Sequence, residues 1–374
     1  MNNGKYLPRF LASGSLMLAS LICLCAAPRG ETRNFQTDIV QSTPSGKAMA
    51  GDTIAKGISA DVGAPVKIFR SVIVDNDNTK WFITEQGIVS FNGEKWVLHN
   101  KNRKVPTQDL KSFAFEVNPL GQELWIASPK GATVAGLPVD GRTGATTYHT
   151  ENTPILSNNV VQVAIGKSPM RWIGTAKGIS GFMDSKWLKN DYDDLYPGGL
   201  FEDYPITSMA TNAGGDSLYV ATDGAGIARV LRNDVDGITG ASVYAQWGPI
   251  LLPSDKIYSI YIASNNTQWF GTDKGVARHI GNNTLANWTV FSTKDGLPDN
   301  FVQAITADAN GQIWLGTKGG ASVFDGTKWA SFTKETGLNS NNILCISVDR
   351  NGVVWFGTDD GVTSYKDQKF TNFR

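Results

Sequence analysis

Glycines crowd around a lysine in the stretch NGQIWLGTKGGASVFDG, which runs from Asn310 to Gly326. A glycine-rich loop between a strand and a helix can bind phosphate, because its backbone N–H groups point at the anion. A phosphate loop of that kind occurs once in a domain. Here similar phrases recur, NNTQWFGTDKGVARHIG before this stretch and NGVVWFGTDDGVTSYKD after it. The recurrence indicates a structural repeat.

Residues that could carry acid–base or metal chemistry are few. The three histidines, His99, His149 and His279, are scattered, and only His149 approaches a connection between blades, with Glu151 nearby. A general base or metal centre needs several such groups to converge. No nucleophile elbow and no histidine pair at ligand spacing occurs. We therefore predict no catalytic and no metal-binding residues, and keep an enzyme as the less favoured class.

Two acidic stretches resemble calcium loops. Asp75–Asn78 reads DNDN and Asn233–Gly237 reads NDVDG. Alternating Asp and Asn supply oxygen ligands, but neither stretch continues to the bidentate Glu of an EF-hand loop. Asp and Asn are also ordinary turn residues. We expect no cofactor, with calcium as the alternative.

The repeats can be aligned on one aromatic residue each. These aromatics are 44, 47, 47, 50, 45 and 41 residues apart. In order, they are Trp81, Trp125, Trp172, Tyr219, Trp269, Trp314 and Trp355. Seven units of forty-odd residues, each reading as four short strands, are typical of a β-propeller.

The predicted fold is all-β, a seven-bladed β-propeller with four antiparallel strands per blade, spanning residues 65–374. The first strand of each blade should line the central channel and the fourth should lie at the rim. The predicted blades are residues 65–108, 109–159, 160–205, 206–255, 256–300, 301–341 and 342–374. The stretch KFTNFR at the chain's end reads as the fourth strand of blade 7, so we expect no strand exchange to lock the ring.

The spacing W-x-G-T predicts how blades pack. Side chains alternate along a strand, so Trp314 and Gly316 should point to one face. A glycine there lets a bulky neighbour approach, and burial of such a tryptophan is worth about 2–3 kcal/mol. A later glycine falls in the turn between the second and third strands, where tight hairpins need positive φ. These turn glycines are Gly87, Gly131, Gly178, Gly226, Gly275, Gly320 and Gly361.

The units resemble the two-component regulator propeller family, whose repeat reads D-x-x-G-x-x-W-x-G-T-x-x-G-v. DANGQIWLGTKGGA (Asp308 to Ala321) and DRNGVVWFGTDDGV (Asp349 to Val362) match nearly throughout. The chain departs from the pattern at Ile83, Ala127 and Ala221, where glycine is expected, and at Tyr219. These departures concern local packing.

The resemblance implies a sensing role. Propellers of this family often form the periplasmic sensing part of hybrid histidine kinases that respond to polysaccharide breakdown products. This sequence ends at Arg374 without a kinase, so we expect signalling to need a separate membrane-bound signalling or envelope protein. Seven-bladed lyases of the streptogramin type have related repeats and represent the enzyme alternative.

A ligand site is predicted where propellers usually bind, on the face of the second turn of each blade. Mixed charges there could hold a small polar ligand or an oligosaccharide. The candidate residues are Glu85, Lys130, Lys177, Asp223, Lys274, Lys318, Asp359 and Asp360. Polar turns are also simply solvated, and that interpretation stays open.

A long connection, KNDYDDLYPGGLFEDYP, follows blade 3. Aromatic side chains on a loop offer flat apolar faces to a carbohydrate or a protein. The rim-loop candidates are Tyr192, Tyr196, Phe201 and Tyr204. The alternative is a loop that folds over its own apolar cluster.

The N-terminus predicts export. Lys5 and Arg9 precede an apolar run from Phe10 to Ala27, so residues 1–27 read as a signal. Cleavage after Ala27, lipid anchoring through Cys25 and an uncleaved anchor all remain open, and each leaves the rest of the chain periplasmic or on the outer surface. Residues 28–64 read as a tether, with a short strand at Thr37–Val40 that could clasp the last blade.

Composition narrows the partners. Lys and Arg number 34 and Asp and Glu 34, so the formal charge is zero, and this argues against nucleic acid. Of three cysteines only Cys345 lies beyond the signal, in the apolar strand NILCISV, where it reads as a buried hydrophobe. We predict an exported, non-catalytic ligand-binding propeller of sensor type, with a protein-interaction scaffold as the alternative.

Overall fold

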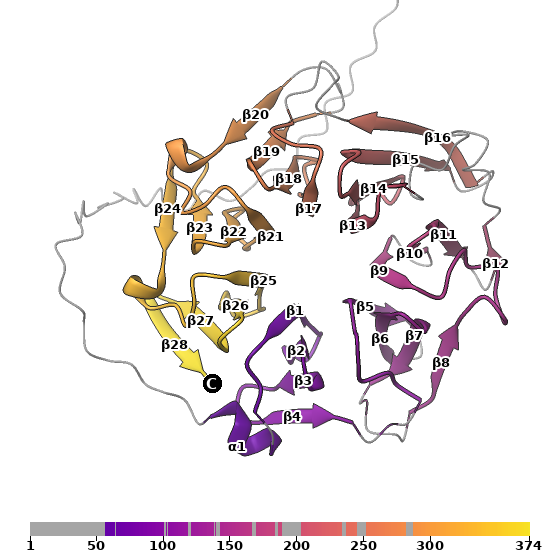
Figure 1. Cartoon of the computed structure of the whole chain (residues 1–374), viewed down its shortest axis with the longest axis horizontal. Helices are drawn as coiled ribbons and strands as arrows, with labels where there is room; N and C mark the ends of the chain where they lie inside the picture. The colour runs from indigo at the N-terminus through magenta and orange to yellow at the C-terminus, as the bar shows by residue number, and fades with distance from the viewer. Residues whose placement is uncertain are drawn as a thin grey trace, which may run out of the picture. The chain divides into compact units, whose positions relative to one another are not determined.

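The computed structural model describes residues 57–374 apart from 64, 101, 103, 119–120, 138, 140–142, 167–169, 184–185, 189–202, 234–236, 245–251 and 282–286. All of these residues belong to the unit Met49–Arg374. They form seven four-stranded antiparallel sheets arranged in a ring (Figure 1). The seven-bladed propeller predicted from the repeats is confirmed. No helix in the described part of the chain is long and apolar enough to cross a membrane.

Each blade is built from four consecutive strands, named A to D from the centre outwards. Blade 1 is β1 (Phe69–Val74), β2 (Lys80–Thr84), β3 (Gly87–Phe91) and β4 (Trp96–His99). Blade 2 is β5 (Ser112–Asn118), β6 (Gly121–Ser128), β7 (Gly131–Gly136) and β8 (Ala145–Tyr148). Blade 3 is β9 (Val160–Ile165), β10 (Arg171–Thr175), β11 (Gly178–Met183) and β12 (Lys186–Trp187). Blade 4 is β13 (Ile206–Thr211), β14 (Ser217–Thr222), β15 (Ile227–Asn233) and β16 (Gly237–Tyr244).

The last three blades follow the same order. Blade 5 is β17 (Ile257–Ile262), β18 (Gln268–Thr272), β19 (Gly275–His279) and β20 (Trp288–Phe291). Blade 6 is β21 (Val302–Ala307), β22 (Ile313–Thr317), β23 (Ala321–Phe324) and β24 (Trp329–Phe332). Blade 7 is β25 (Ile343–Val348), β26 (Val354–Thr358), β27 (Val362–Lys366) and β28 (Lys369–Phe373). The short helices α1 (Ile58–Val62), η1 (Thr293–Asp295) and η2 (Lys334–Thr336) lie outside the sheets.

The first turn of a blade is held by the motif's aspartate. In blade 7, Asp349 Oδ1 accepts the N–H groups of Asn351 (2.9 Å) and Val353 (3.0 Å), and its Oδ2 accepts Trp355 Nε1 (3.1 Å). Asp75 and Asp308 make the same three contacts in blades 1 and 6. The carboxylate therefore satisfies buried donors of the turn and the indole together.

The second turn is held by the threonine of W-x-G-T. In blade 6, Thr317 Oγ1 donates to the carbonyl of Gly320 (2.8 Å) and accepts the N–H of Gly319 (3.1 Å). All seven predicted turn glycines have positive φ, from 76° at Gly226 to 141° at Gly320. A Cβ at Gly320 would lie 2.3 Å from the carbonyl oxygen of Phe332, so this position also requires the absence of a side chain.

Neighbouring blades pack as the alternation predicts. A Cβ at Gly316 would lie 2.7 Å from Ile343 of the next blade, and Trp314 lies edge-on to Phe356 of that blade, with ring centroids 6.0 Å apart. Gly174 and Gly271 are approached in the same way by the first strands of blades 4 and 6. Each blade's tryptophan or tyrosine in this position is at most 4% exposed.

Two of the blade interfaces each contain a buried ion pair, and the two pairs have the same arrangement. Lys80 and Arg171 both precede the repeat tryptophan of their own blade. Lys80 Nζ lies 3.2 Å from Asp349 and 5.0 Å from the centroid of Trp355, both in blade 7. Arg171 contacts Glu116 through two nitrogens (2.6 and 2.8 Å) and lies 5.8 Å from Trp125. In each case the acid also accepts the tryptophan's indole N–H.

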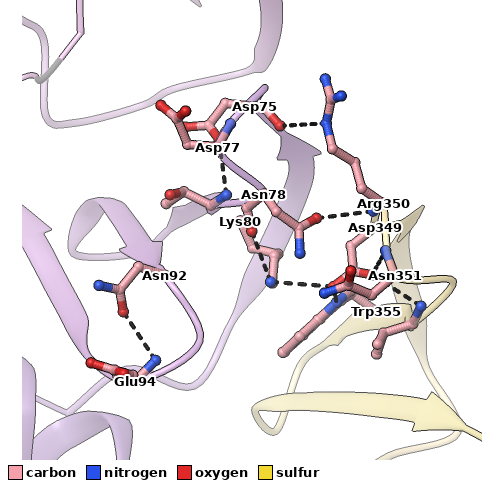
Figure 2. Close-up of polar contacts among 12 residues, drawn as sticks. Asp75, Asp77, Asn78, Lys80, Asn92, Glu94, Asp349, Arg350, Asn351 and Trp355 are labelled. Carbon is pink, nitrogen blue, oxygen red and sulfur yellow. Dashed lines mark hydrogen bonds and ion pairs between the residues drawn. The ribbon is translucent and has the colours of Figure 1, made fainter.

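Blades 7 and 1 meet at an interface that we call the closing seam. Among the described residues it contains no exchanged strand, since β28 pairs with β27 of its own blade. Cys345 Sγ lies 3.4 Å from the carbonyl oxygen of Phe69, and the Arg350 side chain donates to Asn76. Figure 2 shows that Arg350 also donates to the carbonyl of Asp75 and, through its backbone N–H, to Asn78. Side chains of both blades therefore contribute contacts across the seam.

Residues 57–68 reach both blades of the closing seam. Ile58 is fully buried against Trp96 and Phe373, and its N–H donates to the carbonyl of Arg374 (2.6 Å). Further along, the carbonyl of Lys67 accepts the N–H of Gly361 (2.7 Å). Helix α1 thus lies within the stretch that the sequence predicts as a tether. The predicted strand at Thr37–Val40 lies outside the described residues.

Candidate functional site

Strands B and C, and likewise D and the next A, connect at one end of the blades, which we call the mouth face. Six of the seven A strands carry a register shift after their first residue there. The first residue is buried, whereas the second is at least partly exposed. These second residues are Arg70, Val161, Thr207, Tyr258, Gln303 and Leu344. A strands lie at the centre of the ring (Figure 1), so the strand ends that carry these second residues form the inner part of the mouth face.

Three side chains gather near one of these second residues, Tyr258. Tyr258 of β17 packs on Phe301 of the following connection, with ring centroids 4.4 Å apart. Lys318, on the second turn of blade 6, places Nζ 3.7 Å from the Phe301 centroid, a cation–π contact. Backbone contacts fix the group, since the N–H of Lys318 donates to the carbonyl of Phe301 (3.2 Å). We call these three residues the mouth cluster.

The phenol of the mouth cluster stays neutral. Burial raises the pKa of Tyr258, the Asp223 and Asp273 carboxylates raise it further, and Lys256 lowers it less. Tyr258 therefore offers a hydroxyl that can donate as well as accept a hydrogen bond. Asp223 pairs with Lys256 at 3.5 Å on the surface beside it.

The predicted mouth residues all lie on second turns. The acids among them bind other groups of the protein, whereas most of the lysines do not. Glu85 accepts the N–H groups of Lys67 (2.7 Å) and Ile68 (2.9 Å). Asp359 accepts Asn342 Nδ2 (2.9 Å), and Asp360 pairs with Arg374 (3.1 Å). With Asp223 paired to Lys256, each of the four predicted acids has a protein partner.

The remaining lysines project without partners. In the described part of the chain, Lys130, Lys177 and Lys274 are exposed and their side chains make no hydrogen bond or ion pair. The acids of the predicted set are thus engaged within the protein, whereas three of its four lysines are available to a ligand.

The rim loop is described only at its end. Tyr192, Tyr196 and Phe201 lie outside the described residues. Tyr204 is 40% exposed and packs beside Gly224, where a Cβ would lie 3.0 Å from its ring. Tyr204 therefore stands on the mouth face next to the second turn of blade 4.

The histidines occupy separate environments. His99 Nε2 lies 2.8 Å from Ser90 Oγ, and His279 Nδ1 lies 2.7 Å from Gln268 Oε1. Within the described ranges, no three His, Cys, Asp or Glu side chains gather as metal ligands would. The carboxylate of Asp75, from the first calcium-like stretch, accepts hydrogen bonds from the turn and from the Trp81 indole. The second stretch lies partly outside the described residues.

Tyr258 and Phe301 were not among the predicted site residues. Nothing in their local pattern marks them, because they meet only when blades 5 and 6 stack. A usable signal is the second position of each A strand, directly after a buried aliphatic residue, as in the stretch KIYSIYIA.

The structure also contains a groove of about 520 Å³ at the opposite ends of the strands, where the A–B and C–D turns lie. It opens between blades 1 and 7. Figure 2 shows its polar inner end, with Lys80 between Asn78 and Asp349. None of the residues predicted for the mouth lines this groove.

The comparisons with known proteins agree with the fold and the repeat. Residues 296–319 and 337–360 match the family model described as two component regulator propeller. No curated protein matches the chain. Two segments of the seven-bladed propeller thus match this family's repeat. Those two segments are two-component regulator propeller repeats, as the motif predicted.

Solved structures with similar folds come from different functional classes. The extracellular domain of a protein described as a hybrid two-component system from B. thetaiotaomicron is 21% identical, with TM-score 0.64, over 80% of this chain and 39% of that chain. The extracellular domain of one described as a one-component system from that organism is 17% identical, with TM-score 0.61, over 81% and 39%. Virginiamycin B lyase from Staphylococcus aureus is 15% identical, with TM-score 0.56, over 82% and 95%.

These similarities define the fold. The chain spans about two fifths of the length of the two extracellular domains from B. thetaiotaomicron.

Proposed function

We propose that this protein is an exported, non-catalytic ligand-binding propeller of sensor type, and that the ligand binds at the mouth face. The mouth cluster of Tyr258, Phe301 and Lys318 carries the proposal. It combines aromatic surface, a neutral hydroxyl and a cation at a channel opening, which are the features of a small-molecule site. The occupied site would be read by a membrane-bound signalling or envelope protein.

The ligand class follows from the same groups. Aromatic faces beside hydrogen-bonding groups suit a sugar ring, whose C–H face is apolar and whose edge is polar. Lys130, Lys177 and Lys274, which form no ion pair within the described part of the chain, favour a ligand with acidic or strongly polar substituents. We therefore propose a polar small molecule or an oligosaccharide, with acidic forms preferred.

Export rests on independent support. The basic residues and apolar run of positions 1–27 have the order of a secretion signal. Two of the similar solved structures are extracellular domains. The same location suits a sensor that meets oligosaccharides or organic acids before they enter the cell.

A thermal-shift screen against neutral and acidic oligosaccharides, organic acids and divalent ions tests this function. A ligand at a hundred times its Kd stabilises the fold by about 2.7 kcal/mol, which predicts a rise of a few degrees in Tm. Tyr258→Ala and Lys318→Ala should each weaken binding of the hit. Lys328→Ala is the matched control, because Lys328 is an exposed lysine on a turn at the opposite ends of the strands.

Two outcomes would contradict the proposal. One is a screen without a reproducible shift. The other is a ligand whose affinity is the same in wild type, Tyr258→Ala and Lys318→Ala, since it would then bind elsewhere. In the first case a protein partner becomes the better hypothesis, and the scaffold alternative gains support.

A further inference from the structure

The groove between blades 1 and 7 is lined by two walls that come from the two ends of the propeller sequence. Blade 1 and α1 contribute Asp61 and Glu94, and blade 7 contributes Lys366 and Lys369. At its inner end Lys80 and Asp349 pair with each other. Figure 2 shows Glu94 in the turn between β3 and β4 of blade 1, and Asn351 and Trp355 on blade 7.

The floor of the groove is aromatic. Phe91 stacks on Trp96 with centroids 4.5 Å apart, and Trp355 stacks on Phe373 at 5.6 Å. The four rings belong to one core cluster and are 2–7% exposed, so they offer edges rather than open faces. A ligand in this groove therefore meets an apolar base that is already rigid.

The outer charges face the groove without pairing to one another. Lys366, Lys369 and Glu94 are exposed, and none of the three side chains forms an ion pair within the described chain. The Asp61 carboxylate accepts the N–H of Trp96 (3.3 Å). Outside the Lys80–Asp349 pair, the charged residues that line the groove are cations on blade 7 and anions on α1 and blade 1.

We propose that this groove binds a small zwitterion with an apolar side chain, in the class of free amino acids and dipeptides. The ligand's carboxylate lies toward Lys366 and Lys369, its ammonium lies toward Asp61 and Glu94, and its side chain rests on the aromatic floor. A cavity of about 520 Å³ has room for such a molecule. Opposed charges select a ligand that carries both signs, because a ligand with one sign leaves the other wall unsatisfied.

This site is separate from the proposed function. It lies at the opposite ends of the strands from the mouth cluster and shares no residue with it. It joins the two blades that close the ring, so its occupant contacts both sides of the closing seam. Binding should stabilise the ring whether or not the mouth has a ligand.

Isothermal titration of the full chain with L-leucine and L-phenylalanine tests the proposal. N-acetyl-leucine, which lacks the ammonium, and leucinamide, which lacks the carboxylate, are the matched ligands. We expect the free amino acids to bind about ten-fold or more tightly than either blocked form. The double variant Lys366→Ala/Lys369→Ala and the single variant Glu94→Gln should weaken amino-acid binding by a similar factor.

Controls separate this site from the mouth. Lys328→Ala, an exposed turn lysine on the same end of the blades, should leave the affinity unchanged. Tyr258→Ala should also leave the amino-acid affinity unchanged. A loss of ligand binding at the mouth in that variant would not alter binding in the groove. No binding of either amino acid, equal binding of the blocked forms, or full affinity in the Lys366→Ala/Lys369→Ala variant would each overturn the proposal.

Discussion

Lys80 in blade 1 and Asp349 in blade 7 form an ion pair across the closing seam, with 3.2 Å between Nζ and Oδ2 and side chains only 4% and 2% exposed. Lys80 also donates to the carbonyl of Asn78 and lies over Trp355. Asp349 holds the first turn of its blade and the Trp355 indole. The ion pair thus links blade 1 to blade 7 through the same carboxylate that holds the first turn of blade 7.

Replacement of Lys80 by Met should destabilise the ring. It leaves the Asp349 charge buried without its cation, and removal of one partner of a buried pair costs about 3–5 kcal/mol. We expect Tm to fall by on the order of 10 °C, measured by calorimetry. Lys80→Arg keeps the charge and should lose much less, and Lys328→Met, on the surface, should be neutral. A Lys80→Met variant as stable as wild type would refute the role of the pair.

Asp349 should make stability depend on acid pH. Burial alone would raise its pKa, but hydrogen bonds from Trp355, the backbone and Lys80 outweigh burial, so the pKa lies below the usual value. The contribution of this carboxylate is therefore complete above about pH 4 and is lost as pH falls through the depressed pKa. Between pH 5 and pH 2, Asp349→Asn should lose less Tm than wild type. Parallel acid profiles for the two proteins would count against it.

The turn glycine of blade 6 can be tested against a neighbour. Gly320 has φ of 141° and a Cβ there would lie 2.3 Å from a carbonyl oxygen, whereas Gly326 has φ of 100° and nothing within 4 Å. Gly326→Ala should cost about 1–2 kcal/mol, the price of left-handed backbone alone. Gly320→Ala should cost at least about 2 kcal/mol more, because the hairpin must also shift. Urea unfolding of both variants measures the difference, and equal losses would contradict the close approach.

Cys345 should report opening of the closing seam. Burial raises the pKa of its thiol to about 12, so almost no thiolate exists at neutral pH. Alkylation of Cys345, followed by peptide mass spectrometry to separate it from Cys23 and Cys25, should be very slow in the native protein. Lys80→Met should accelerate it, since labelling then follows opening at Phe69, the residue that the sulfur contacts. Fast labelling of the wild type would mean that the seam opens readily.

The fold could be predicted because its determinants are local and repeated. The aromatic at Trp314 and the glycines at Gly316 and Gly320 lie in one short stretch, and each reports a constraint of strand or turn geometry. Repeat-based prediction fails for a structural element that does not belong to the repeat. Helix α1 is only five residues long, ISADV, and contains no full apolar period that would distinguish it from a tether.

The candidate sites are harder to predict from the sequence, because their residues are distant from one another along the chain. The mouth face could be predicted from polar second turns, but the Asp360–Arg374 and Asp223–Lys256 pairs depend on chain segments that meet only in the ring. Tyr258 and Phe301 come from adjacent blades. The groove combines residues near both ends of the described chain, which no local pattern brings together.

Each sheet is made from one uninterrupted segment, and the N–H of Ile58 bonds to the carbonyl of Arg374. The backbone hydrogen bonds within the sheets therefore do not determine which blade follows which, because every sheet is complete within its own segment. The order around the circle is set by contacts at the interfaces, such as the side chains of Lys80 against Asp349 and of Arg171 against Glu116, and the backbone bond from Gly361 to Lys67. A circular permutant joined between Arg374 and Gly57 and opened elsewhere would keep every ladder and every one of these neighbours.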